Sequence, residues 1–238
     1  MSDKRGKDLS KAPRADVERF LRQVAATPHV KNAGQRGRLI FAMDATASRA
    51  PLWDQACQIQ ADMFRETAQL GGLSIQLVHF GGYQEFHATP WYDDAGALLK
   101  QMTAVTCLSG MTQIERVLRH SLAETRAHRV QALVFIGDAC EEDPAVLHQL
   151  AGQLNIAGTP AFVFQEGGDR LAEVVLREIA RLSGGAWCRF DAGSAHQLRD
   201  LLAAVAVYAA GGRKALEQHS AGSRGLAQEL VRQLPAPK

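Results

Sequence analysis

Neither a signal peptide nor a membrane-spanning segment is visible in this 238-residue sequence. The first residues are polar and charged, without the apolar stretch that a secretory signal needs. The most apolar run, at 201–210, has ten residues, whereas a helix that crosses a bilayer needs about 20. We therefore expect a cytoplasmic protein that makes no contact with a membrane.

Cysteine is scarce, and the motifs of several enzyme classes are missing. The four cysteines form no C-x-x-C pair, so they are expected to be free thiols in a reducing compartment. The eight histidines form no close pair in the sequence, which argues against a zinc site. The chain also lacks a Gly-x-x-x-x-Gly-Lys phosphate loop and a nucleophile-elbow serine.

Charge is distributed unevenly along the chain. Residues 1–38 carry 10 basic and 4 acidic residues, residues 39–210 carry 12 and 19, and residues 211–238 carry 5 and 2. The acidic centre is compatible with cation binding. The basic ends contain only one aromatic residue, Phe20, so neither base stacking nor a nucleic-acid partner is expected.

Apolar runs of strand length alternate with amphipathic runs of helix length. Strands are expected at 39–43, 73–80, 85–89, 130–137, 160–165 and 187–190, and helices at 51–70, 95–102, 112–128, 144–154, 170–182 and 195–210. This alternation predicts an α/β fold, a doubly wound, Rossmann-like three-layer sandwich. Its sheet is mostly parallel, with one short antiparallel edge strand that ends at Pro90.

Three regions are expected in the chain. Residues 1–37 form a basic N-terminal extension with a short amphipathic helix at 15–26, residues 38–210 form the α/β domain, and residues 211–238 form a basic, partly helical C-terminal tail.

Oxygen-bearing side chains follow the first predicted strand. Asp44, Thr46 and Ser48 come directly after the apolar run 39–43 and supply one carboxylate and two hydroxyls. Ligands of α/β sheets collect outside the carboxyl ends of the strands. Oxygen ligands with few carboxylates are what Mg²⁺ prefers.

Two more oxygen donors occur at later strand-to-helix junctions. Thr112 follows the turn at 109–111 and precedes an amphipathic run, and Asp138 follows the apolar strand at 132–137. Three separate loops can therefore converge on one ion. The same side chains are also common helix caps, which is the simpler interpretation of each of them taken alone.

The order Asp-x-Thr-x-Ser, then Ser-Gly-x-Thr, then strand-Gly-Asp resembles the metal-ion-dependent adhesion site of a von Willebrand factor type A (VWA) domain. The resemblance covers roughly residues 36–210. Two departures stand out, because the family usually has serine where this chain has Thr46 and glycine after the last aspartate. Here Asp138 is followed by Ala139 and an acidic run at 141–143.

The resemblance implies a non-enzymatic module for protein–protein interaction that depends on Mg²⁺, with Mn²⁺ as an alternative ion. Thr46, Ser48 and Thr112 would bind the ion directly, and Asp44 and Asp138 mainly through water. An Asp or Glu of the partner would complete the coordination. Bacterial intracellular relatives often work beside AAA-type ATPases or assembly factors, which the resemblance suggests as partners.

Two other functions remain open at this stage. A phosphatase of the haloacid dehalogenase class also binds Mg²⁺ on a Rossmann-like sheet, but it needs a second carboxylate where this chain has Thr46. The third interpretation is a scaffold domain whose metal site is vestigial. The sequence does not indicate the oligomeric state.

Overall fold

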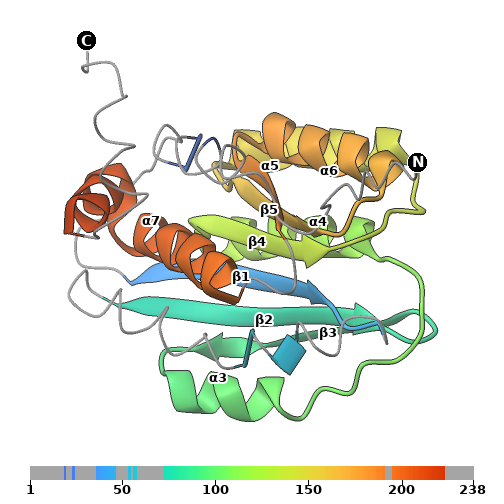
Figure 1. Cartoon of the computed structure of the whole chain (residues 1–238), viewed down its shortest axis with the longest axis horizontal. Coiled ribbons are helices and arrows are strands. Elements are labelled where there is room, and N and C mark those ends of the chain that lie inside the picture. Colours follow the sequence, from blue (N-terminus) through green and yellow to red (C-terminus); the bar gives the residue numbers. More distant parts are fainter. Residues whose placement is uncertain are drawn as a thin grey trace, which may run out of the picture.

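A six-stranded sheet forms the centre of the molecule, in the order β3-β2-β1-β4-β5-β6 (Figure 1). The computed structural model describes residues 19, 23–24, 36–46, 53–54, 56–57, 72–190 and 195–222. Its strands are β1 (Gly37–Asp44), β2 (Leu73–Gly81), β3 (Glu85–Tyr92), β4 (Ala132–Gly137), β5 (Ala161–Glu166) and β6 (Ala186–Phe190). All neighbouring strands pair in parallel except β3, which is antiparallel to β2 at one edge.

Helices cover both faces of this sheet, and the alternation of the strands divides the core in two. The described helices are α3 (Ala95–Met102), α4 (Ile114–Ala127), α5 (Pro144–Ala157), α6 (Arg170–Ser183) and α7 (Ala195–Gly222). Leu39, Phe41 and Met43 of β1 share a core with α3 and α7, while Ile40 and Ala42 share one with α4, α5 and α6. The predicted doubly wound three-layer sandwich is confirmed.

Local sequence signals set the limits of several helices. Asp143 precedes α5 and accepts a hydrogen bond from the backbone N of Ala145 (2.9 Å); Asp169 caps α6 in the same way. Gly158 and Gly184 end these two helices in the left-handed conformation. These ends lie within a few residues of the predicted ones.

The edge strand β3 continues past Pro90, where the sequence analysis ended it. Proline lacks the N–H of a regular ladder, and side chains supply hydrogen bonds at this point. Thr89 Oγ1 accepts from Leu77 N (3.1 Å), and Gln76 Nε2 donates to the carbonyl of Thr89 (3.0 Å). The strand therefore runs to Tyr92 beside an irregularity in the β2–β3 register.

The last helix, α7, is buried over ten consecutive residues, 201–210. A helix that is apolar on all sides is expected to be enclosed in this way. Its backbone is non-helical at Gly212 (φ 73°, ψ −169°), so two helices meet at a kink there. Val24 of the N-terminal extension belongs to the same core and is fully buried, so this residue of the extension contributes to the domain core.

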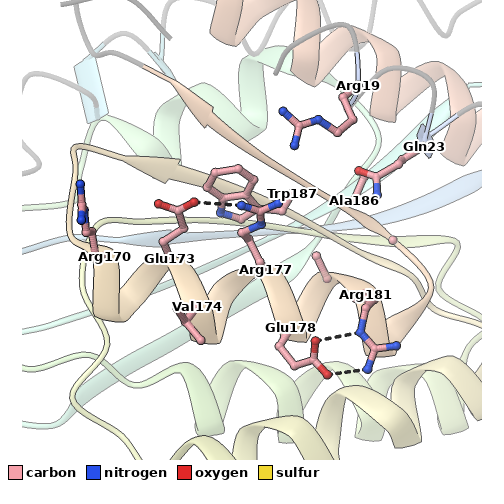
Figure 2. A pocket seen from close by; sticks show the side chains of 12 residues that line it. Arg19, Gln23, Arg170, Glu173, Val174, Arg177, Glu178, Arg181, Ala186 and Trp187 are labelled. Carbon is pink, nitrogen blue, oxygen red and sulfur yellow. Dashed lines mark hydrogen bonds and ion pairs between the residues drawn. The ribbon is translucent and has the colours of Figure 1, made fainter. Parts of the chain in front are cut away.

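Two other described residues of the N-terminal extension lie near α6. Arg19 and Gln23 line a cavity of about 560 Å³ together with α6 and the start of β6 (Figure 2). Arg177 lies over the ring of Trp187, 4.8 Å from its centroid, and forms an ion pair with Glu173 (Nη1–Oε1 3.0 Å). The cavity thus has paired charges along its wall.

Some predicted elements fall partly outside the described residues. Of the helix expected at 51–70, residues 53–54 and 56–57 are described, and all four are helical. Of the helix expected at 15–26, residues 19, 23 and 24 are described and helical. Among the helices that are described, none is long and apolar enough to cross a membrane.

Gly185 and Gly152 give a matched test of the packing. A Cβ at Gly185 would lie 2.0 Å from the carbonyl oxygen of Ala161, so we expect Gly185→Ala to lower the free energy of unfolding by about 1–3 kcal/mol. Gly152, inside α5, has open space, and Gly152→Ala should raise that free energy by roughly 0.5–1 kcal/mol. Urea denaturation measures both, and equal effects of the two substitutions would contradict this packing.

Candidate functional site

Asp44 and Asp138 lie at the same edge of the sheet because their strands are parallel neighbours. Met43 of β1 is paired with Ile136 of β4. Asp44 is the last residue of β1, and Asp138 comes directly after Gly137, the last residue of β4. The side chain of Asp44 is buried, with the residue only 2% exposed.

The segment at 103–113 passes over the ends of the neighbouring strands. Leu108 N donates to the carbonyl of Ala45 (3.0 Å), and Gly82 N donates to the carbonyl of Leu108 (3.3 Å). Gly110 approaches the turn after β2 so closely that a Cβ would lie 2.2 Å from the carbonyl oxygen of Gly82. Glycine is thus required at position 110, and these contacts bring the segment with Thr112 to the end of β1.

Thr112 is tied to the loop that follows β4. Its Oγ1 donates to Glu141 Oε2 (2.6 Å), and its backbone N donates to the same oxygen (3.1 Å). Glu141 follows Asp138 by three residues. The segments that carry Thr112 and Asp138 are therefore joined by a carboxylate, with Thr112 itself 8% exposed.

Glu142 fixes the start of α4, which begins at Ile114 and not at Thr112 as the sequence analysis expected. Gln113, at the N-cap position, makes no side-chain cap. Instead, Glu142 accepts hydrogen bonds from Ile114 N (2.5 Å) and Glu115 N (2.8 Å). A carboxylate at a helix N-terminus is stabilised by the helix dipole, so this charge is balanced locally.

The remaining residues of the predicted Asp-x-Thr-x-Ser group are only partly described. Thr46 N donates to Asp44 Oδ1 (2.8 Å), which holds this carboxylate against the backbone that follows β1. Ser48 lies outside the described residues. Asp44, Thr46, Thr112 and Asp138 are thus placed on segments that meet at one edge of the sheet.

The chemistry of these side chains suits a hard divalent cation. Two aspartates and the hydroxyls of two threonines are oxygen donors, as Mg²⁺ requires. Within the described residues, no group of three or more His, Cys, Asp or Glu side chains is arranged to hold a metal. A site of this composition would therefore depend on its hydroxyls, and Glu141 would orient one of them, that of Thr112.

Cys140 lies in the same loop, but it does not have the character of a reactive thiol. It is half-buried, and burial raises the pKa of its thiol above the ordinary value, although a hydrogen bond to the backbone of Glu142 acts in the opposite direction. A thiol with a raised pKa is mainly protonated near neutral pH and is a poor nucleophile.

Glu141 and Glu142 were not predicted from the sequence as parts of the site. Only their position after Asp138 could have pointed to them, as the place where the resemblance to the family is broken. The acidic run gives this loop carboxylates that hold Thr112 and α4.

Comparisons with known proteins support the fold. No family model matches the chain, and no curated protein matches it. Among solved structures, it is similar to the SpRpn10 VWA domain, with a TM-score of 0.52 and 12% identity over 84% of this chain and 96% of that one.

Two further solved structures are similar over shorter parts of their own length. Proximal thread matrix protein 1 from the mussel byssus, with a zinc-occupied MIDAS motif, has a TM-score of 0.56 and 17% identity over 76% of this chain and 48% of that one. A D319A mutant of the PilB minor pilin from Streptococcus sanguinis has a TM-score of 0.57 and 10% identity over 87% of this chain and 65% of that one. At such identities the likeness concerns the fold.

Glu142→Gln tests the cap of α4. The substitution keeps the shape of the side chain but removes its charge, so we expect the free energy of unfolding at pH 7 to fall by about 1 kcal/mol. Glu178→Gln is a control, since Glu178 forms an exposed pair with Arg181 on α6 and should have little effect. Thermal unfolding followed by circular dichroism compares the two, and an unchanged Glu142→Gln protein would contradict the capping role.

Proposed function

We propose that this chain, which has the fold of a von Willebrand factor type A domain, is a non-enzymatic module that binds a partner protein through a divalent metal ion. The observation that carries this proposal is the meeting of three segments at one edge of the sheet. Asp44 ends β1, Asp138 follows β4, and Thr112 is tied to the Asp138 loop by Glu141.

The metal is proposed to be held by Asp44, Thr46, Ser48, Thr112 and Asp138. Thr112 donates its hydroxyl proton to Glu141 Oε2 and accepts a long hydrogen bond from the backbone N of Glu141 (3.4 Å), so one lone pair of Oγ1 is left for a cation. An acceptor behind a ligand orients it and increases its basicity. Glu141 is therefore proposed as the residue that positions Thr112, and not as a ligand.

Mg²⁺ is the proposed ion, with Mn²⁺ as an alternative, because the donor set consists of oxygen atoms. The zinc-occupied MIDAS motif of the mussel protein supports a divalent metal at a site of this kind in that protein. A site with few direct carboxylates leaves positive character on the ion. An Asp or Glu side chain from a partner can then occupy a remaining position.

The identity of the partner is proposed only through this chemistry, as an exposed acidic side chain on another protein. The three similar structures give no support for an AAA-type ATPase as the partner. A phosphatase mechanism is disfavoured, because Thr46 stands where a second carboxylate would act as the general acid.

Asp44→Asn should abolish the binding of Mg²⁺ and Mn²⁺ while the fold persists, because it removes a carboxylate without changing the size of the side chain. Isothermal titration calorimetry measures the loss, and circular dichroism reports the fold. Asp200→Asn, at an exposed position on α7, is the control and should bind as the wild type does. Equal affinity of the Asp44→Asn and wild-type proteins for Mg²⁺ and Mn²⁺ would rule out the proposed metal site.

Capture of partners should depend on the metal. With immobilised protein as bait, we expect specific partners in Mg²⁺ that are lost with EDTA, and also lost in Mg²⁺ with the Asp44→Asn bait. Quantitative mass spectrometry compares the three samples, with Asp200→Asn as the matched bait. Partners that persist in EDTA and on the Asp44→Asn bait would indicate a scaffold that binds without metal.

A further inference from the structure

Two histidines that are eight residues apart in the sequence face each other on the edge of the sheet. His79 of β2 is the register partner of His87 of β3. Their ring centroids are 5.0 Å apart, and the ring planes differ by 26°. The histidines form no close pair in the sequence, and the antiparallel turn after β2 is what places these two side chains on the same face.

The ring nitrogen atoms of His79 and His87 form no hydrogen bond to any residue that the structure describes. His120 shows the contrast, since its Nε2 lies 2.8 Å from Gln76 Oε1. His79 is half-buried, and among the described residues its ring has no hydrogen-bonding partner, although buried polar groups usually have one. His87 is exposed, so its ring is free to turn towards an incoming ligand.

The surroundings keep His79 neutral. Burial lowers its pKa to about 4, with the neighbouring His87 as a second cause. The edge of Trp53 packs against the ring at 5.7 Å and closes one side. At neutral pH the imidazole therefore retains a lone pair, the form in which histidine binds metals.

The two rings are stacked, and the nitrogen lone pairs lie in the ring planes, so one ring must turn before both can bind the same ion. We propose that the exposed His87 turns in this way, and that His79 and His87 then form a two-imidazole binding site for a late first-row transition metal, Zn²⁺ or Cu²⁺, with water in the remaining positions. Imidazole nitrogens suit these ions, whereas Mg²⁺ prefers oxygen. The site is separate in residues and ligand chemistry from the one at Asp44. A metal ion held by both histidines would link the edge strand β3 to β2. Because such an ion would bind only the folded protein, it would stabilise the fold.

The Asp44→Asn background isolates the histidine site, because it removes the proposed oxygen site as an alternative place for Zn²⁺. Tag-free protein is treated with EDTA, dialysed and titrated with Zn²⁺ by calorimetry and with Cu²⁺ by electron paramagnetic resonance. His87→Gln is the test variant, since the side chain is exposed and its loss should leave the fold intact. His128→Gln, at an exposed position after α4, is the matched control.

We expect one equivalent of metal, and a Cu²⁺ spectrum with coupling to two nitrogen atoms. Even outer partners of metal ligands typically contribute 10–100-fold to affinity, so loss of a direct ligand in His87→Gln should weaken binding by at least about tenfold. His128→Gln should bind unchanged. Equal binding by His87→Gln, or no saturable binding in the Asp44→Asn background, would overturn the proposal without affecting that of the Mg²⁺ site.

Discussion

The candidate site depends on two neighbouring carboxylates in the loop after β4. Glu141 holds Thr112 through the hydroxyl and the backbone N–H of that threonine, and Glu142 caps α4, which begins at Ile114, two residues after Thr112. Hydrogen bonds to a charged acceptor are stronger than neutral ones. This pair of contacts fixes the segment at 103–113 relative to β4, and the contact between Leu108 and Ala45 fixes it relative to β1.

The fold could be predicted from the sequence because its signals are local and agree with one another. The apolar run at 39–43 and the aspartate caps of α5 and α6 each define their element without help from distant residues. The parallel order of the strands follows from the helical connections between them. Asp44 and Asp138 could be assigned to one edge for the same reason.

Features that depend on contacts between distant segments could not be predicted. The continuation of β3 beyond Pro90 relies on the side chains of Gln76 and Thr89. The true start of α4 relies on Glu142, 28 residues from Ile114. The pairing of His79 with His87 required the register of an antiparallel turn. In each case the sequence contains the residues, but their partners are known only once the strands are placed.

The central claim is that three segments of this chain hold one divalent cation at the carboxyl edge of the sheet. A crystal structure of the protein with Mn²⁺, with data collected on the manganese absorption edge, tests it most directly. We predict an anomalous difference peak beyond the ends of β1 and β4, in contact with the hydroxyl of Thr112 and joined to Asp44 directly or through water. Fully occupied manganese elsewhere, with no peak at this edge, would contradict the account.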